Sequence, residues 1–317
     1  MLITKFLLID KPIRYALGII VLILLTGTTY TLVTQGTMAF LSPTYLLQQL
    51  QVASFLGLVA TGMMMVILLG HIDLSIPWTV TCAAMAATAM GGEWAIPAGL
   101  AAGLIIGLVN GLGVAFLRVP SMIFTLGVNT VIQGLMVVYT GGFAPQTHST
   151  PIMETLATGH LLGIPNALFV WAFVGSLIVF MLTRTAMGRY IFAIGNREVA
   201  AYLSGINTRL VLIASFVMCS LCASMAGILL AGYSTKAYQG MGDLYLLPAI
   251  AAVVIGGTNI LGGKGTFTGT VVGAILIVLL QSVLSVMQMP EAGRQVIYGT
   301  VIISMLLVYG RGEKKEG

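Results

Sequence analysis

The sequence predicts an all-α integral membrane protein of about ten transmembrane helices, and three observations lead to this fold class. Hydrophobic residues make up 58% of the 317 residues, charged residues make up only 7%, and the mean hydropathy is +1.04. Soluble domains carry roughly 25% charged residues, so a soluble fold is excluded. The apolar runs have the length of about 20 residues that a helix needs to cross a membrane. They are continuously apolar rather than alternating, which favours helices over a barrel.

The apolar runs and the positions of the basic residues together predict a topology. We expect helices at roughly 13–34, 46–69, 74–91, 94–117, 121–140, 165–183, 211–232, 245–260, 267–288 and 292–309. With the N-terminus in the cytoplasm, ten spans return the C-terminus to the cytoplasm. Of the 14 Lys and Arg residues, only Lys236 and Arg294 then fall outside. This bias follows the positive-inside rule and predicts a single transmembrane domain over 1–317 with both termini cytoplasmic.

Two apolar segments, at 70–92 and 242–265, are shorter and more broken than the others. Each begins with Gly, continues with Asp73 or Asp243 and then Pro77 or Pro248, and ends in paired glycines. On the expected topology Asp73 lies inside and Asp243 outside, so the two units have opposite orientation. Paired broken segments of this kind are typical of transport pathways built from inverted repeats. We expect the first repeat over about 46–140 and the second over about 211–309.

One loop, about 184–210, separates two apolar segments and carries five charged residues: Arg184, Arg189, Arg197, Glu198 and Arg209. A charge in hydrocarbon costs at least about 2.5 kcal/mol, so this loop must lie in water, and its arginines indicate the cytoplasmic side. We expect a short helix from Asn196 to Leu203, with Asn196 as N-cap, Glu198 in the first turn and Gly205 at the end. Such a helix offers a surface to a soluble partner.

Several polar residues interrupt the apolar segments and are candidates for a solute pathway: Asp73, Ser75, Asn110, Asn129 and Gln133. An ionisable residue at membrane depth is by default functional and needs a partner. Asp73 or Ser75 could instead cap the helix that starts near Pro77. The amides could bond other helices, or they could donate and accept toward the hydroxyls of a solute. Both interpretations remain open at the level of sequence.

The sequence shows no catalytic or metal-binding pattern. Cys82, Cys219 and Cys222 lie in apolar runs without neighbouring His or acids, which favours small buried cysteines over a metal or redox site. The stretch LGGKG at 261–265 lacks the first glycine and the Ser or Thr of a nucleotide-binding loop. We therefore expect no cofactor and no metal. A secondary carrier working alone would need more intramembrane acids than Asp73, and a membrane-embedded enzyme would need clustered His, Cys or acids.

Three passages resemble the membrane-spanning permease subunits of bacterial ATP-binding-cassette importers, in the branch that takes up ribose and other simple sugars. They are GHIDLSIPW at 70–78, GRYIFAIGNREVAAYLSGIN at 188–207 and VVIGGTNILGGKGTFTGTVVGAILI at 253–277. Their order and spacing also fit, so the resemblance extends from about residue 10 to 310. His71 and Pro77 stand where that family has glycine, which makes the backbone stiffer there.

The resemblance implies a permease subunit in a bacterial inner membrane that moves a small polyhydroxylated solute by alternating access. Its implied partners are a cytoplasmic ATP-binding subunit that hydrolyses the ATP, an extracytoplasmic solute-binding protein and a second permease chain; no nucleic acid is implied. The residues implied to couple to the ATPase are Gly195, Asn196, Glu198, Ala200, Ala201, Ser204 and Gly205.

Overall fold

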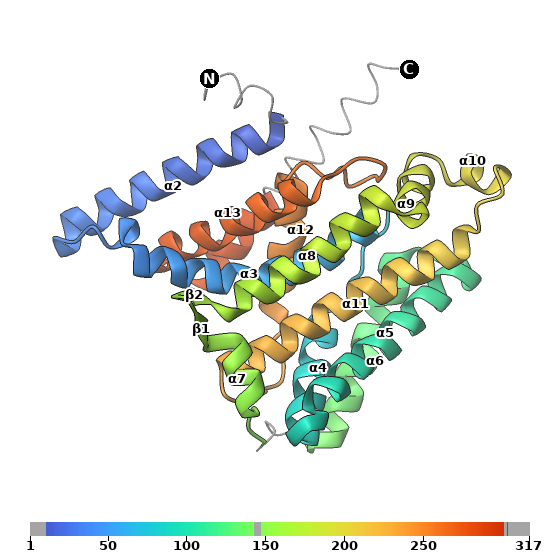
Figure 1. Ribbon diagram of the computed structural model, residues 1–317, viewed down its shortest axis with the longest axis horizontal. Coiled ribbons are helices and arrows are strands. Elements are labelled where there is room, and N and C mark those ends of the chain that lie inside the picture. The colour runs from blue at the N-terminus through green and yellow to red at the C-terminus, as the bar shows by residue number, and fades with distance from the viewer. Residues whose placement is uncertain (1–10, 143–146, 301–302, 304–317) are drawn as a thin grey trace.

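The structure, a computed structural model, describes residues 11–142, 147–300 and 303, and these residues are almost entirely helical (Figure 1). The longer helices are α2 (Lys11–Gln35), α3 (Pro43–Ile67), α4 (Ile76–Met90), α5 (Ala95–Leu117), α6 (Ser121–Thr140), α8 (Asn166–Arg184), α11 (Thr208–Tyr233), α12 (Leu246–Ile255) and α13 (Phe267–Val286). Residues 291–300 are also helical. The remainder of the last expected helix, 292–309, lies outside the described residues except for residue 303.

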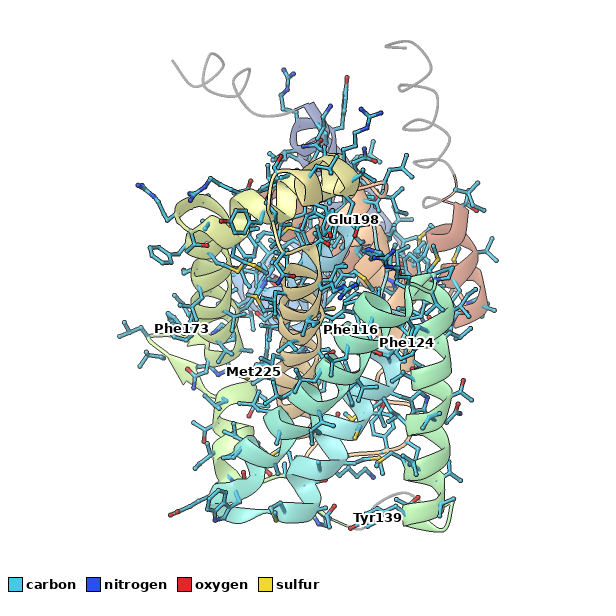
Figure 2. All side chains as sticks on the ribbon, turned by 90° about the vertical axis from the view of Figure 1, so that its right-hand side faces the viewer. Phe116, Phe124, Tyr139, Phe173, Glu198 and Met225 are labelled. Carbon is cyan, nitrogen blue, oxygen red and sulfur yellow. The ribbon has the colours of Figure 1, made fainter. Side chains whose placement is uncertain are left out.

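Short elements connect these helices. They are η1 (Ala39–Leu41), η2 (Gly92–Trp94), α7 (Pro151–Thr158), β1 (His160–Leu161), β2 (Ile164–Pro165), α9 (Ala186–Asn196), α10 (Glu198–Leu203) and η3 (Asp243–Tyr245). Strands β1 and β2 form one antiparallel pair. Figure 2 shows Glu198, on α10, near one end of the molecule and Tyr139, at the end of α6, at the opposite end.

Among the described residues, seven helices are long and apolar enough to cross a membrane: α2, α3, α5, α6, α8, α11 and α13. Helices α4 and α12 are shorter and apolar. The chain is therefore an all-α membrane protein. The expected helix at 245–260 is too long, because α12 ends at Ile255 and Gly256–Gly257 follow it.

Side-chain caps set several of the helix beginnings. The Ser42 hydroxyl accepts a hydrogen bond from the Tyr45 N–H, and Pro43 follows it in the first turn of α3. The Asn207 side chain accepts from the Leu210 N–H at the start of α11, and Thr266 caps α13 in the same way. The sequence thus encodes these boundaries locally.

The core of the molecule lies where α3 and α11 pack among the other helices. Buried residues make up 89% of the most apolar stretch of α3 and 67% of that of α11. Four glycines of α5 lie against α11: Gly99 faces Ile228, Gly103 faces Ser224, Gly107 faces Val217 and Gly111 faces Ile213. A Cβ atom at any of them would come too close to α11. Their four-residue spacing, which brings all four onto one side of α5, is typical of such close helix packing.

Candidate functional site

Asp73 lies in the irregular connection between α3 and α4, and its side chain is fully buried. Its Oδ1 atom accepts hydrogen bonds from the Ser75 N–H at 2.9 Å and the Ser75 hydroxyl at 2.6 Å. The Asn110 amide, from α5, lies 3.4 Å from both carboxylate oxygens and donates to the Ser75 hydroxyl at 2.7 Å. Asp73 forms no ion pair within the part of the chain that the structure describes.

The expectation that Ser75 or Asp73 caps α4 is wrong in its details. Ser75 occupies the N-cap position, but its side chain makes no capping hydrogen bond. The hydroxyl instead donates to Asp73, and the Asp73 carboxylate accepts the Ser75 N–H. The Asn110 Oδ1 atom is buried and has no hydrogen-bond partner in the described structure. Asp73, Ser75 and Asn110 therefore form a closed polar cluster that no solute reaches in this conformation.

A row of polar side chains on α6 accepts the backbone N–H groups of the same broken segment. The hydroxyl of Ser121 accepts from Ile72 at 3.3 Å, that of Thr125 from Leu74 at 2.9 Å, and Asn129 Oδ1 from Trp78 at 3.3 Å. Residues spaced by four share one face of a helix. Non-helical backbone at membrane depth is tolerated only where protein or water satisfies its polar groups. Sequence reasoning missed Ser121 and Thr125, although their four-residue spacing with Asn129 was visible.

Helix α6 also carries polar groups that the described remainder of the chain leaves partly or fully exposed. Asn129 is half-buried, and Gln133, one turn further on, is exposed. Of the seven span-length helices, α6 has the lowest mean hydropathy and is also the least buried, at 17% of its most apolar stretch. A helix exposed to lipid should be the most apolar, because unpaired amides in hydrocarbon are costly. The exposed face of α6 is still mostly apolar, with Ile123, Val131 and Leu135 each more than 60% exposed, and Gln133 is the exposed amide among them that needs a partner.

The second broken segment, between α11 and α12, forms side-chain hydrogen bonds with α4 and α6. Gly242 donates its N–H to the Thr81 hydroxyl of α4 at 3.2 Å, and the Gln239 side chain donates to the Thr140 hydroxyl of α6 at 2.6 Å. Asp243, which matches Asp73 in the sequence pattern, is exposed. The two broken segments thus have different surroundings.

The loop 184–210 forms two helices rather than the single expected one. Asn196 is the last residue of α9 and not an N-cap; Arg197 occupies that position, and its side chain makes no capping bond. Gly205 ends α10 as expected: at a φ of +84°, it allows the Ile206 N–H to reach the Ala201 carbonyl at 3.1 Å.

The residues of this loop divide into an exposed and an inward-facing group. Asn196, Glu198, Ala200, Ser204 and Gly205 are exposed, Gly195 is half-buried and Ala201 is buried. Sequence reasoning missed three apolar residues of α10: Val199, Tyr202 and Leu203 are 70%, 68% and 79% exposed. Exposed apolar side chains that gather on one short helix are typical of an interaction surface.

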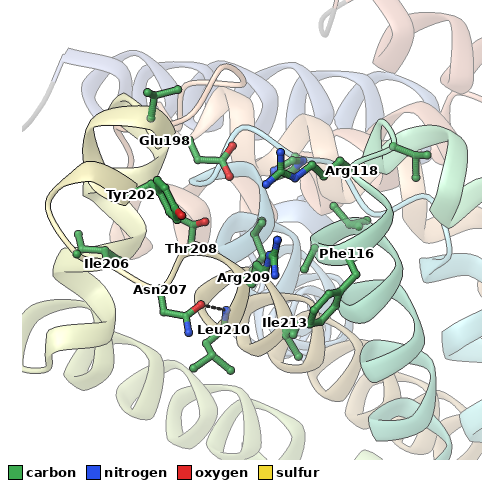
Figure 3. A pocket seen from close by; sticks show the side chains of 17 residues that line it. Phe116, Arg118, Glu198, Tyr202, Ile206, Asn207, Thr208, Arg209, Leu210 and Ile213 are labelled. Carbon is green, nitrogen blue, oxygen red and sulfur yellow. Dashed lines mark hydrogen bonds between the residues drawn. The ribbon is translucent and has the colours of Figure 1, made fainter.

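A cavity of about 990 Å³ opens beside α10, between the end of α5 and the start of α11 (Figure 3). Glu198 of α10 and Arg118 at the end of α5 point toward one another across it. The Arg209 guanidinium lies 5.1 Å from the centre of the Phe116 ring, a cation–π contact. Burial lowers the pKa of His71, which also lines the cavity, and the nearby Glu198 carboxylate partly opposes this effect.

Comparison with known proteins identifies the family to which the chain belongs. The model of the family described as branched-chain amino acid transport system / permease component matches residues 45–306. The chain belongs to this permease family. It is therefore a multi-pass inner-membrane component of a transport system and not an enzyme.

Three relatives of this permease are import permeases. The ribose import permease protein RbsC of Escherichia coli K12 is 36% identical over 267 residues, 82% of this chain and 83% of the relative. The protein of the same name from Haemophilus influenzae is 33% identical over 276 residues, 84% of this chain and 85% of the relative. The autoinducer 2 import system permease protein LsrC of Salmonella typhimurium LT2 is 32% identical over 265 residues, 82% of this chain and 76% of the relative. No solved structure gives a significant match to the permease.

Proposed function

We propose that this permease is a subunit of an ATP-driven importer that moves a small polyhydroxylated solute, such as a simple sugar, across the inner membrane by alternating access. The observation that carries the proposal is the 36% identity to a ribose import permease over 82% of the chain. The relatives that import autoinducer 2 support the same class of small solute.

The topology belongs to the proposal. Ten membrane segments would comprise the seven span-length helices, α4, α12 and the helix that includes 291–300, with both termini in the cytoplasm. The beginning of α2 lies toward the same end of the molecule as α9 and α10 (Figure 1), which supports this orientation. The two repeats, about 46–140 and 211–309, would each comprise a long helix, a broken segment, a short helix and two further helices. Helices α3 and α11, of 25 and 26 residues, would correspond to one another.

The proposed partners of the permease follow from its assignment as an importer subunit. A cytoplasmic ATPase would engage α10 through its exposed apolar residues Val199, Tyr202 and Leu203, together with the exposed members of the predicted coupling set. The permease would receive its solute from an extracytoplasmic binding protein and would act with a second permease chain. ATP-driven movement of the ATPase subunits would then displace α10.

We assign the solute pathway to the exposed face of α6. Gln133 and Asn129 are amides that both donate and accept hydrogen bonds, as recognition of hydroxyl groups requires. Gln133 is exposed between apolar side chains, and an unpaired amide in hydrocarbon is costly, so its position supports a water-filled path or a second permease chain beside it. Asp73, Ser75 and Asn110 hold the backbone behind this face, so we propose a supporting role for them in place of solute contact.

Purification from the native membrane and uptake together test the proposal. The tagged permease should co-purify with a protein that carries a phosphate-binding loop, and the complex should take up [14C]ribose into ATP-loaded liposomes in the presence of the binding protein. Replacing Gly205 by Leu should abolish uptake while the permease remains inserted, because its positive φ strains any other residue. If the chain purifies alone and catalyses ATP-independent uptake, it is a secondary carrier. Competition by excess leucine would point instead to amino acids.

The pathway assignment has its own test. Gln133→Ala should lower uptake by about tenfold, since each lost hydrogen bond to solute is worth about 1 kcal/mol or more, while the amount of co-purified ATPase stays unchanged. The matched control is Gln48→Ala, which removes an exposed glutamine near the start of α3. Equal uptake by the two variants would exclude Gln133 from the pathway.

A further inference from the structure

Three loops that are far apart in the sequence meet through their backbones at one place. Leu68 follows the end of α3, Gly195 lies in the last turn of α9, and Gly262–Gly263 lie between α12 and α13. The Gly263 N–H donates a hydrogen bond to the Leu68 carbonyl at 2.9 Å. A Cβ atom at Gly195 would overlap the Leu68 carbonyl oxygen and lie 2.6 Å from the Gly263 nitrogen. No side chain fits between these loops.

Each loop touches the other two. A Cβ atom at Gly262 would lie 2.8 Å from the Gly70 nitrogen and 3.0 Å from the Gly195 carbonyl oxygen, and one at Gly70 would lie 3.0 Å from the Leu261 carbonyl oxygen. Gly262 and Gly263 adopt φ values of +95° and +76°, which favour glycine for a second reason. We call Leu68, Gly70, Gly195, Gly262 and Gly263 the glycine junction.

The junction lies between the proposed ATPase surface, the first broken segment and the connection between α12 and α13. Leu68 is five residues before Asp73, in the segment that α6 holds through Ser121 and Thr125. Gly263 is three residues before Thr266, which caps α13. Backbone atoms in van der Waals contact resist compression, so a displacement of the end of α9 must move Leu68 and Gly263 with it.

We infer that the glycine junction transmits the movement of α10 to the first broken segment and to the connection that leads into α13, and that Gly195 and Asn196 act within the junction rather than in docking to the ATPase. The inference rests on the proposed function, in which an ATPase moves α10. The role inferred for Gly195 and Asn196 differs from the one expected from the sequence, which placed both residues in the surface that docks to the ATPase.

The positions of the two residues separate transmission from docking. Gly195 is half-buried against Leu68 and Gly263. Asn196 is exposed overall, but its Oδ1 atom lies against Gly263. A Cβ atom added at Gly263 would lie 2.5 Å from this oxygen. The exposed apolar residues of α10, such as Tyr202, belong to a separate surface. Changes at the junction and changes on α10 should therefore cause different defects.

The test compares four variants of the full-length permease, isolated with its co-purifying ATPase and reconstituted with the binding protein. Gly195→Ala adds one methyl group to the junction, and Asn196→Ala removes a side chain without adding atoms, so the second variant carries no risk of steric misfolding. Tyr202→Ala changes the docking surface. Gly18→Ala, on α2 in open space, is the matched glycine control. The readouts are ATPase bound per permease, ATP hydrolysis and [14C]ribose uptake.

Gly195→Ala should retain its ATPase and hydrolyse ATP, but uptake should fall by about tenfold, the size of effect expected when coupling between sites is weakened. Asn196→Ala should retain its ATPase and lose uptake about threefold. Tyr202→Ala should lose ATPase binding, and Gly18→Ala should match the unmodified chain.

Two results would overturn the inference. Loss of the ATPase from Gly195→Ala or Asn196→Ala would assign these residues to docking, and full uptake by Asn196→Ala would show that the junction does not transmit. Failure of the proposed function would give a result different from either of these two. In that case the unmodified permease binds no ATPase and shows no ATP-dependent uptake.

Discussion

The two broken segments of the permease have similar sequence patterns and different surroundings. In the first, Asp73 is fully buried and bonded to Ser75 and Asn110, and α6 accepts three backbone N–H groups. In the second, Asp243 is exposed, and its N–H bonds to the carbonyl of Gly240 within the same segment. The pattern of Gly, Asp and Pro breaks the helix in both places, but neighbouring helices decide how the freed backbone groups are satisfied.

This difference indicates which of the two broken segments is held rigidly by the rest of the protein. The first segment is tied to α5 and α6 by side-chain hydrogen bonds, so its movement must move those helices with it. The second is tied to α4 and α6 through Thr81 and Thr140, and its acid is free of the protein interior. We expect the first segment to act as part of a rigid body and the second to open locally at lower cost.

The largest expected effect on stability comes from removing Asp73, and removal of Asp243 provides the comparison. Asp73→Ala leaves the Ser75 N–H and hydroxyl and the Asn110 amide without their shared acceptor, and should destabilise the permease by about 3 kcal/mol. Asp243→Ala should stay within about 0.5 kcal/mol, as is usual for exposed sites. Thermal unfolding in detergent measures both. Asp73→Asn, which keeps an acceptor oxygen, should recover most of the loss, and equal stability of the two alanine variants would remove the contrast between the segments.

A smaller effect is expected at α6. Thr125→Val replaces the acceptor of the Leu74 N–H by an isosteric methyl group and should cost about 1 kcal/mol, because the half-buried donor is left unpaired. The control is Thr130→Val on the same helix, since the exposed Thr130 hydroxyl bonds only the carbonyl of Leu126. Hydrogen exchange should also accelerate in the peptide containing Leu74. Unchanged exchange there would indicate that α6 does not hold the segment.

The smallest expected effect is on the pH dependence of stability and involves His71. Burial lowers the pKa of His71 in the folded protein below its usual 6.5, while Glu198 partly opposes the shift. Below about pH 6.5 the unfolded chain binds a proton that the folded chain resists, so stability falls as the pH decreases through this range. His71→Gln should flatten this decrease between about pH 6.5 and 5. Parallel curves for the variant and the unmodified chain would mean that His71 is solvated.

Much of the fold could be predicted from local properties of the sequence. Continuous apolar length predicts the spanning helices, since hydrocarbon requires every backbone group to be bonded within its own segment. The four-residue spacing of the α5 glycines predicts a close helix contact, which the structure confirms with α11 as the partner. Gly205 could be placed at the end of α10 because a left-handed residue is needed there.

The roles of the polar residues depended on contacts between distant parts of the chain. Asp73 and Gln133 were equivalent candidates in the sequence, yet one is enclosed by α5 and the other is exposed on α6. Ala201 was expected on the coupling surface, but the six-residue α10 turns it inward. Periodicity shows which residues share a face and cannot show what that face meets.

The sequence by itself determined that the chain is a helical membrane protein and where most of its helices begin and end, because these properties arise from hydrophobicity and caps along short stretches. Only the tertiary structure decided that Leu68, Gly195 and Gly263 touch, that α6 supplies the acceptors for the first broken segment, and that the two acids have opposite exposure. Those contacts join residues separated by about fifty to two hundred positions, and close packing alone brings them together.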